Sequence, residues 1–224
     1  MSTELKTQHF TRFMDFYGDL PDEFLPWMLL QTSDGTQWTI KQWIDNLLAL
    51  FPRDTIPAKL HLQKGLSFQP PRFLFGWAMS SSVLFKIAQR CNFLPPNTRG
   101  PETLKWAKMV LPLNAVLREK FPEIMARLPG YALIDPVMTT DWRYHQCIVL
   151  ADSYVTGNSK PSQDDINTLK DFLGIGEGST QALADNQAKW WVDYGQYTWR
   201  YMDSREFNAV SKPWLKEVRK LQSK

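Results

Sequence analysis

The chain has 224 residues and carries 26 basic and 23 acidic side chains, which gives a formal net charge of +3. This length is typical of one larger domain, and we expect residues 1–224 to form a single globular domain. The small, mixed charge does not predict a nucleic-acid partner. Hydrophobic residues make up 43% of the chain and aromatic residues 13%, which predicts a core large enough to fold without crosslinks.

Two further features bear on where such a chain works. Residues 1–13 lack the basic and apolar regions of a secretory signal, and the longest uncharged run, residues 73–85, is shorter than the ~20 residues of a membrane-spanning helix. We therefore expect a soluble protein with no membrane partner. The two cysteines, Cys91 and Cys147, are too few for a four-thiolate zinc site. We expect unpaired thiols and a cytoplasmic location.

Two segments carry clear helix signals. Residues 40–51 place apolar side chains at the helical period, after Thr39 as an N-cap and before Pro52. Residues 163–173 follow a serine N-cap and end at a glycine. Before the first of these helices, an Asp-Gly pair at 34–35 between alternating residues is compatible with one small N-terminal β-hairpin.

Helical periodicity extends over most of the remaining chain, which 15 prolines divide into short segments. We expect further helices at residues 4–17, 72–91, 141–156, 180–203 and 213–222, and shorter ones that begin near Pro101, Pro112 and Pro122. These segments predict an all-α fold, a single irregular domain of about eight to nine helices. Irregular packing is expected because the prolines keep the helices short.

The expected helix at 141–156 carries a group of residues that could do chemistry. On a helix, Asp141, His145 and Asp152 lie within about 40° of one another, so two carboxylates and an imidazole would share one face. Such a face could hold a metal ion or provide an acid-base pair. The same spacing also fits an ordinary solvent-exposed face, with Asp141 in the first helical turn. No histidine pair with zinc-binding spacing is present.

Aromatic residues are concentrated near the C-terminus. On the expected helix at 180–203, Trp190, Tyr194, Tyr197 and Tyr201 form one stripe, because they recur at helical spacing. Flat side chains with polar tips can line a pocket for a planar ligand or contact a partner protein. A stripe of this kind can equally face the core of the domain.

The sequence therefore supports two functions. The leading hypothesis is a helical binding or interaction protein that uses its aromatic residues to hold a small apolar or aromatic ligand or a protein partner. The alternative is a small enzyme with its site between helices. In it, His145 with Asp141 and Asp152 is the acid-base or metal-binding group, and the C-terminal aromatic residues line the substrate pocket. No motif identifies a cofactor or a resident metal.

Overall fold

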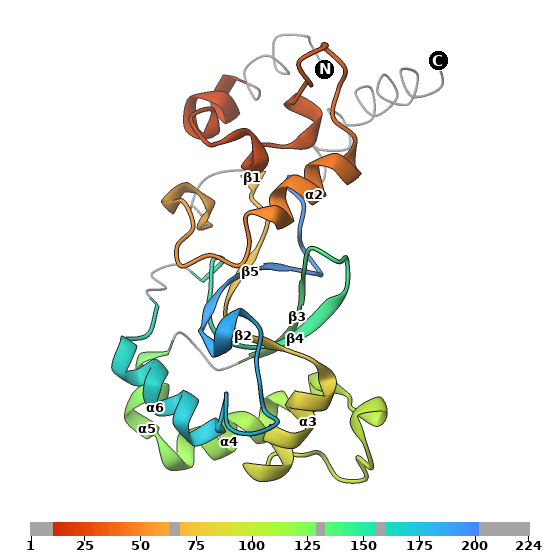
Figure 1. The fold of residues 1–224 in the computed structure, drawn as a ribbon. Coiled ribbons are helices and arrows are strands. Elements are labelled where there is room, and N and C mark those ends of the chain that lie inside the picture. Colours follow the sequence, from red (N-terminus) through yellow and green to blue (C-terminus); the bar gives the residue numbers. More distant parts are fainter. Residues whose placement is uncertain (1–10, 63–67, 129–132, 156–159, 202–224) are drawn as a thin grey trace.

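The computed structural model describes residues 11–62, 68–128, 133–155 and 160–201. At its centre four antiparallel strands form a closed barrel, in the order β2 (Phe73–Met79), β4 (Tyr144–Asp152), β3 (Leu133–Met138) and β5 (Lys189–Asp193). Figure 1 shows the barrel between the N-terminal part of the chain at one end and a group of later helices at the other. The all-α fold predicted from the sequence is therefore wrong.

Alternate residues of the strands point into the barrel and fill it. This interior cluster contains Leu74, Ala78, Val137, Cys147, Val149 and Trp191, all at most 2% exposed. The indole nitrogen of Trp191 donates a hydrogen bond of 3.1 Å to the carbonyl oxygen of Gly76, so its polar atom is satisfied inside the barrel. A Cβ atom at Gly76 would lie 2.0 Å from the carbonyl oxygen of Ile148, so glycine is required where β2 approaches β4.

The segment at 72–91, expected as one helix, is divided between a strand and a helix. All seven residues of β2 are buried, and Ser80 then caps helix α3 (Ser81–Arg90) by accepting a hydrogen bond from the backbone N–H of Val83. A short apolar run that is buried on both sides has no distinctive period, so it fits a strand as well as a helix. The serines marked the boundary between the two elements.

The predictions of helices at 141–156 and 180–203 are also wrong, because these segments too contain apolar runs that are buried on both sides. Residues 147–151 of β4 are all buried, and so are residues 190–193 of β5. The adjacent residues Trp190 and Trp191 are each 2% exposed but belong to two different clusters, one outside and one inside the barrel. This arrangement requires the two-residue alternation of a strand. The chain then continues to β6 (Arg200–Tyr201), which pairs with β1 (Phe68–Gln69).

The two helices with strong end signals are confirmed. Helix α2 (Ile40–Ala49) begins with a capping box between Thr39 and Gln42 and buries its apolar face. Helix α6 (Gln163–Leu173) begins at Ser162, whose hydroxyl accepts from the backbone N–H of Asp165 at 3.1 Å, and ends at a left-handed glycine. Local capping chemistry therefore predicted the start of both helices and the end of α6, whereas α2 ends at Ala49, before the predicted residue 51.

Short helical elements complete the described fold. Residues 11–17 are helical, and helices α4 (Val110–Lys120) and α5 (Pro122–Arg127) follow the 3-10 turns at Pro101–Thr103 and Trp106–Lys108. The Asp-Gly turn at 34–35 closes a single bridge between Gln31 and Gln37. The expected helix at 213–222 lies outside the described residues.

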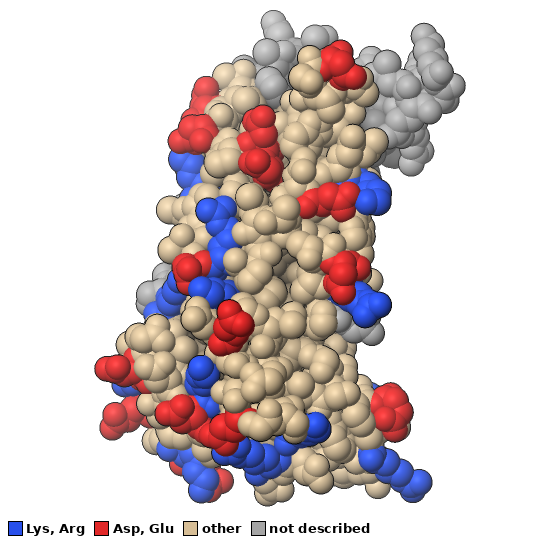
Figure 2. Space-filling model, viewed as in Figure 1, with Lys and Arg blue, Asp and Glu red and all other residues tan. Residues whose placement is uncertain are grey.

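Three general expectations can be compared with this fold. Cys91 and Cys147 are both unpaired and buried, as predicted. Within the described ranges, no helix is both long and apolar enough to cross a membrane. Figure 2 shows basic and acidic side chains interspersed over the face in view, without one large patch of either sign. That surface agrees with the small net charge of the chain.

Candidate functional site

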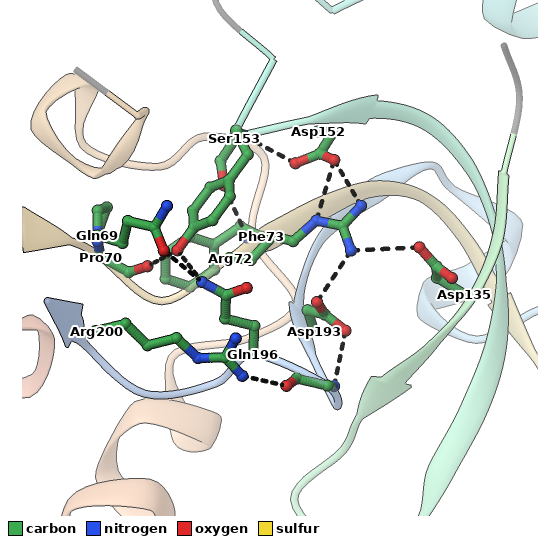
Figure 3. A network of polar contacts seen from close by, with 12 residues as sticks. Gln69, Pro70, Arg72, Phe73, Asp135, Asp152, Ser153, Asp193, Gln196 and Arg200 are labelled. Carbon is green, nitrogen blue, oxygen red and sulfur yellow. Dashed lines mark hydrogen bonds and ion pairs between the residues drawn. The ribbon is translucent and has the colours of Figure 1, made fainter. Parts of the chain in front are cut away.

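One end of the barrel holds a cluster of four charged residues, with one residue from each strand or its flank. Arg72 directly precedes β2, Asp135 lies in β3, Asp152 ends β4 and Asp193 ends β5. We call this group the Arg72 cluster. The closed barrel brings together residues that are up to 121 positions apart in the chain. Figure 3 shows the guanidinium of Arg72 pointing toward the three carboxylates.

Every nitrogen of the Arg72 guanidinium contacts a carboxylate. Nε and Nη2 donate to the same oxygen of Asp152 at 3.0 and 2.6 Å. Nη1 donates to Asp193 at 3.2 Å and lies 3.4 Å from Asp135. Asp193 and Asp152 are deeply placed, with side chains 5% and 10% exposed, whereas those of Arg72 and Asp135 are 21% exposed. The cluster is therefore partly open to solvent at Asp135.

Backbone groups hold two of the three carboxylates in place. The second oxygen of Asp152 accepts from the backbone N–H of Tyr154 at 2.8 Å, and that of Asp193 accepts from the backbone N–H of Gly195 at 2.9 Å. The backbone of Arg72 is also fixed, because its carbonyl accepts from the N–H of Asp193 at 3.0 Å. Asp135 has the longest contact with the guanidinium and is the least constrained of the three.

The electrostatics of the cluster follow from burial and from the excess of carboxylates. Burial raises the pKa of Asp135, and the neighbouring Asp152 raises it further, while Arg72 opposes both effects. Burial also raises the pKa of Asp193, although the hydrogen bond from the N–H of Gly195 and the charge of Arg72 each lower it in part. Burial alone would lower the pKa of Arg72, but Asp152 and then the other two carboxylates raise it overall. Arg72 therefore stays charged, and Asp135 and Asp193 retain protons more readily than free aspartates.

Further polar groups, among them the charged Arg200, flank the cluster on the side of β1 and β6. The side-chain amide of Gln196 donates to the hydroxyl of Tyr154 at 2.6 Å, and that hydroxyl donates to the carbonyl oxygen of Pro70. Burial raises the pKa of Tyr154, so its hydroxyl stays protonated and able to donate. Arg200 donates to the carbonyl oxygen of Gly195 at 3.0 Å. These contacts, drawn in Figure 3, join the end of the barrel to the paired strands β1 and β6.

The residues predicted as an acid-base group are not all together. Asp141 is exposed in the turn between β3 and β4, His145 is half-buried in β4, and Asp152 is part of the Arg72 cluster. Seven residues along a strand separate His145 from Asp152 by about 20 Å, whereas a helix would have placed them on one face. Burial lowers the pKa of His145, and nearby Asp141 opposes this shift. Only Asp141 and His145 are thus brought near each other.

The aromatic residues near the C-terminus do not form one stripe. Trp190 is buried in the core outside the barrel, Tyr197 packs against the same core, and Tyr194 is 47% exposed. The side chain of Tyr201 lies outside the described part of the structure. The backbone N–H of Tyr194 donates to the carbonyl oxygen of Pro136 at 3.0 Å, which places Tyr194 next in space to the residue that follows Asp135. Of the predicted ligand-binding residues, Tyr194 is therefore the exposed one, and its backbone lies near Asp135.

Sequence reasoning missed Arg72, Asp135 and Asp193. Each aspartate of the cluster lies within or directly after an apolar run that forms a strand, and Arg72 directly precedes such a run. A charged residue at the edge of a buried run needs a partner, because an unpaired buried charge is costly. The position of these charged residues beside apolar runs could have indicated the cluster. It was overlooked because the runs were interpreted as helices.

Two further observations concern possible metal ligands and similarity to known proteins. Among the described residues, no group of three or more histidine, cysteine, aspartate or glutamate side chains is arranged to hold a metal ion. In the Arg72 cluster, the guanidinium lies between the carboxylates (Figure 3). Comparison with models of protein families, with curated proteins and with solved structures finds no match. The function is therefore argued from the geometry of the chain itself.

Proposed function

We propose that this chain is a binding protein that holds a ligand with a positively charged group at the Arg72 end of the barrel. The observation that carries the proposal is the excess of three carboxylates over one guanidinium at a position where Arg72 and Asp135 are 21% exposed. Burying negative charge without full compensation is unfavourable. An ammonium or guanidinium group from a ligand would supply the missing charge.

Asp135 is the carboxylate best placed to contact such a group. It has the weakest contact with Arg72, at 3.4 Å, and it is the most exposed of the three aspartates. Asp152 and Asp193 each already accept one hydrogen bond from the backbone and one or more from Arg72. A ligand cation at Asp135 would form a charge-assisted contact without disrupting the contacts of the other two carboxylates.

Tyr194 supports a ligand with an aromatic or apolar part. Its side chain is 47% exposed, and its backbone is bonded to Pro136, next to Asp135. Exposed tyrosines are frequent in binding surfaces, since they combine a flat apolar face with a polar tip. The proposed ligand is therefore an organic cation or a basic side chain of a partner protein, with an adjoining apolar group.

The enzyme hypothesis receives less support. It requires Asp152 beside His145, but Asp152 is held by Arg72 at the end of β4. Asp141 and His145 remain near each other at the turn between β3 and β4.

A cytoplasmic location is also part of the proposal, and the two buried, unpaired cysteines support it.

Isothermal titration calorimetry with tyramine tests the proposal, and 4-ethylphenol is the matched ligand without the charge. We expect tyramine to bind, 4-ethylphenol to bind at least about tenfold more weakly, and Asp135→Asn to remove that difference, since tenfold corresponds to one ion-pair contact of about 1.4 kcal/mol. Asp171→Asn, an exposed position on α6, is the matched control and should bind tyramine like the parent protein. Equal binding of the two ligands, or equal affinity of the two variants for tyramine, would contradict the proposal.

A further inference from the structure

A short segment at residues 181–187, just before β5, lies against the end of the barrel opposite Arg72. Leu183 and Ala184 are half-buried and pack against the interior cluster of the barrel. The backbone N–H of Leu183 donates at 2.8 Å to the carbonyl oxygen of Ala78, near the end of β2. Figure 1 shows the segment as a short blue turn beside the label of β2, on the side of the later helices. We call residues 181–187 the lid.

The lid has few polar contacts with the barrel. Among the described residues, the bond from Leu183 to Ala78 is the one hydrogen bond between the lid and the barrel strands. Other bonds lie within the lid itself, because the side chain of Asn186 accepts from the backbone N–H of Ala182 at 2.6 Å and donates to the side chain of Gln181 at 2.7 Å. A segment with internal bonds and one bond to its support can move as a unit.

The lid also has an unfavourable backbone conformation at three successive residues. Ala184, Asp185 and Asn186 have φ values of 52°, 52° and 61°. L-amino acids disfavour this left-handed region, which is usually entered by single residues and most readily by glycine, asparagine and aspartate. Ala184 is the least suited of the three, because it has no polar side chain that could bond locally. Strain in the backbone therefore opposes the packing of the lid on the barrel.

We propose that the lid opens while the rest of the chain stays folded, and that opening exposes the interior of the barrel to small molecules in solution. Strained segments with few anchoring contacts open at a lower free-energy cost than a packed core. Gly176 and Gly178, both at positive φ, precede the lid and give the chain the freedom to turn there. Cys147 lies inside the barrel beside the lid, since it is the strand partner of Ala78. The lid is at the other end of β2 from Arg72, and the inference does not depend on the function proposed above.

Labelling of Cys147 with 4,4′-dithiodipyridine tests the proposal, because the fully buried thiol can react only after an opening. The full chain with Cys91→Ala leaves Cys147 as its single thiol. Without urea we expect labelling at least about tenfold faster than global unfolding permits, with a much smaller urea dependence, because opening the lid exposes little surface. A urea dependence equal to that of global unfolding would overturn the proposal.

Two variants on this background assign the opening to the lid. Ala184→Gly relieves the strain of the closed lid, so labelling of Cys147 should slow at least about threefold. Leu183→Ala removes apolar contact with the interior cluster, so labelling should accelerate at least about threefold. Asn97→Gly is the matched control and should leave the rate unchanged, because Asn97 also has a positive φ, of 66°, but is exposed in the loop after α3. A rate of either lid variant equal to that of the control would overturn the proposal.

Discussion

Replacing Arg72 by methionine removes the positive charge from the end of the barrel while keeping an apolar stem. Arg72 donates at 3.0 and 2.6 Å to Asp152 and at 3.2 Å to Asp193, and the side chains of these aspartates are 10% and 5% exposed. Removing one partner of a buried ion pair costs about 3 to 5 kcal/mol. Because Arg72 is 21% exposed, we expect a loss near the lower bound, about 3 kcal/mol at pH 7.

The loss should depend on pH in a definite direction. The pKa values of Asp135 and Asp193 are raised in the folded protein, so they favour folding below the unfolded pKa, and this contribution disappears as pH rises through the folded pKa. Without Arg72 these carboxylates should hold their protons still more strongly. Acid therefore relieves the repulsion in the variant, and at pH 4 we expect Arg72→Met to cost only about 1 kcal/mol.

Urea denaturation at pH 7 and pH 4, at constant ionic strength, measures both values. Arg143→Met is the matched control, because the side chain of Arg143 is 82% exposed and its contact with Asp141 is 3.6 Å long. The control should change the free energy of unfolding by less than about 0.5 kcal/mol. An Arg72→Met loss below about 1 kcal/mol at pH 7, or an equal loss at both pH values, would refute the electrostatic account of the cluster.

Three further predictions concern the core. Leu47→Ala on α2 should lower the free energy of unfolding by about 2 to 5 kcal/mol in urea, because Leu47 is fully buried; a loss below about 1 kcal/mol would contradict this packing. Gly76→Ala should cost about 2 to 3 kcal/mol in the same assay, because its Cβ would lie 2.0 Å from a carbonyl oxygen of β4, and an unchanged midpoint would show that the strands can separate there. Thiol titration under denaturing, non-reducing conditions should find both Cys91 and Cys147 free, and a monomer mass lower by two hydrogens would show a disulfide instead.

Local signals predicted those parts of the fold whose ends are set by local chemistry. Helix α2 combines an N-cap at Thr39 with one apolar face, and helix α6 lies between Ser162 and a left-handed glycine. In both helices, neighbouring residues in the chain satisfy the backbone groups at the ends. Such elements do not require knowledge of distant contacts, which is why the sequence alone sufficed.

The barrel could not be predicted in this way, because its strands are buried on both faces. β2 and the central part of β4 are continuously buried, so the alternation that marks a strand is absent from their sequences. The prolines do not all mark the boundaries of elements either, since Pro136 lies within β3. The Arg72 cluster depends on this barrel, because the partners of Arg72 lie 80 and 121 residues along the chain.

The central claim, that the Arg72 end of the barrel binds a cationic ligand, is tested most directly by amide-resolved NMR during a titration with tyramine. The account predicts that the largest shifts occur at the backbone N–H groups of Tyr154 and Gly195, which bond to the carboxylates of the cluster, and at Tyr194. These shifts should be absent in Asp135→Asn. Shifts that centre instead on the turn containing Asp141, or no shifts at saturating tyramine, would contradict the account.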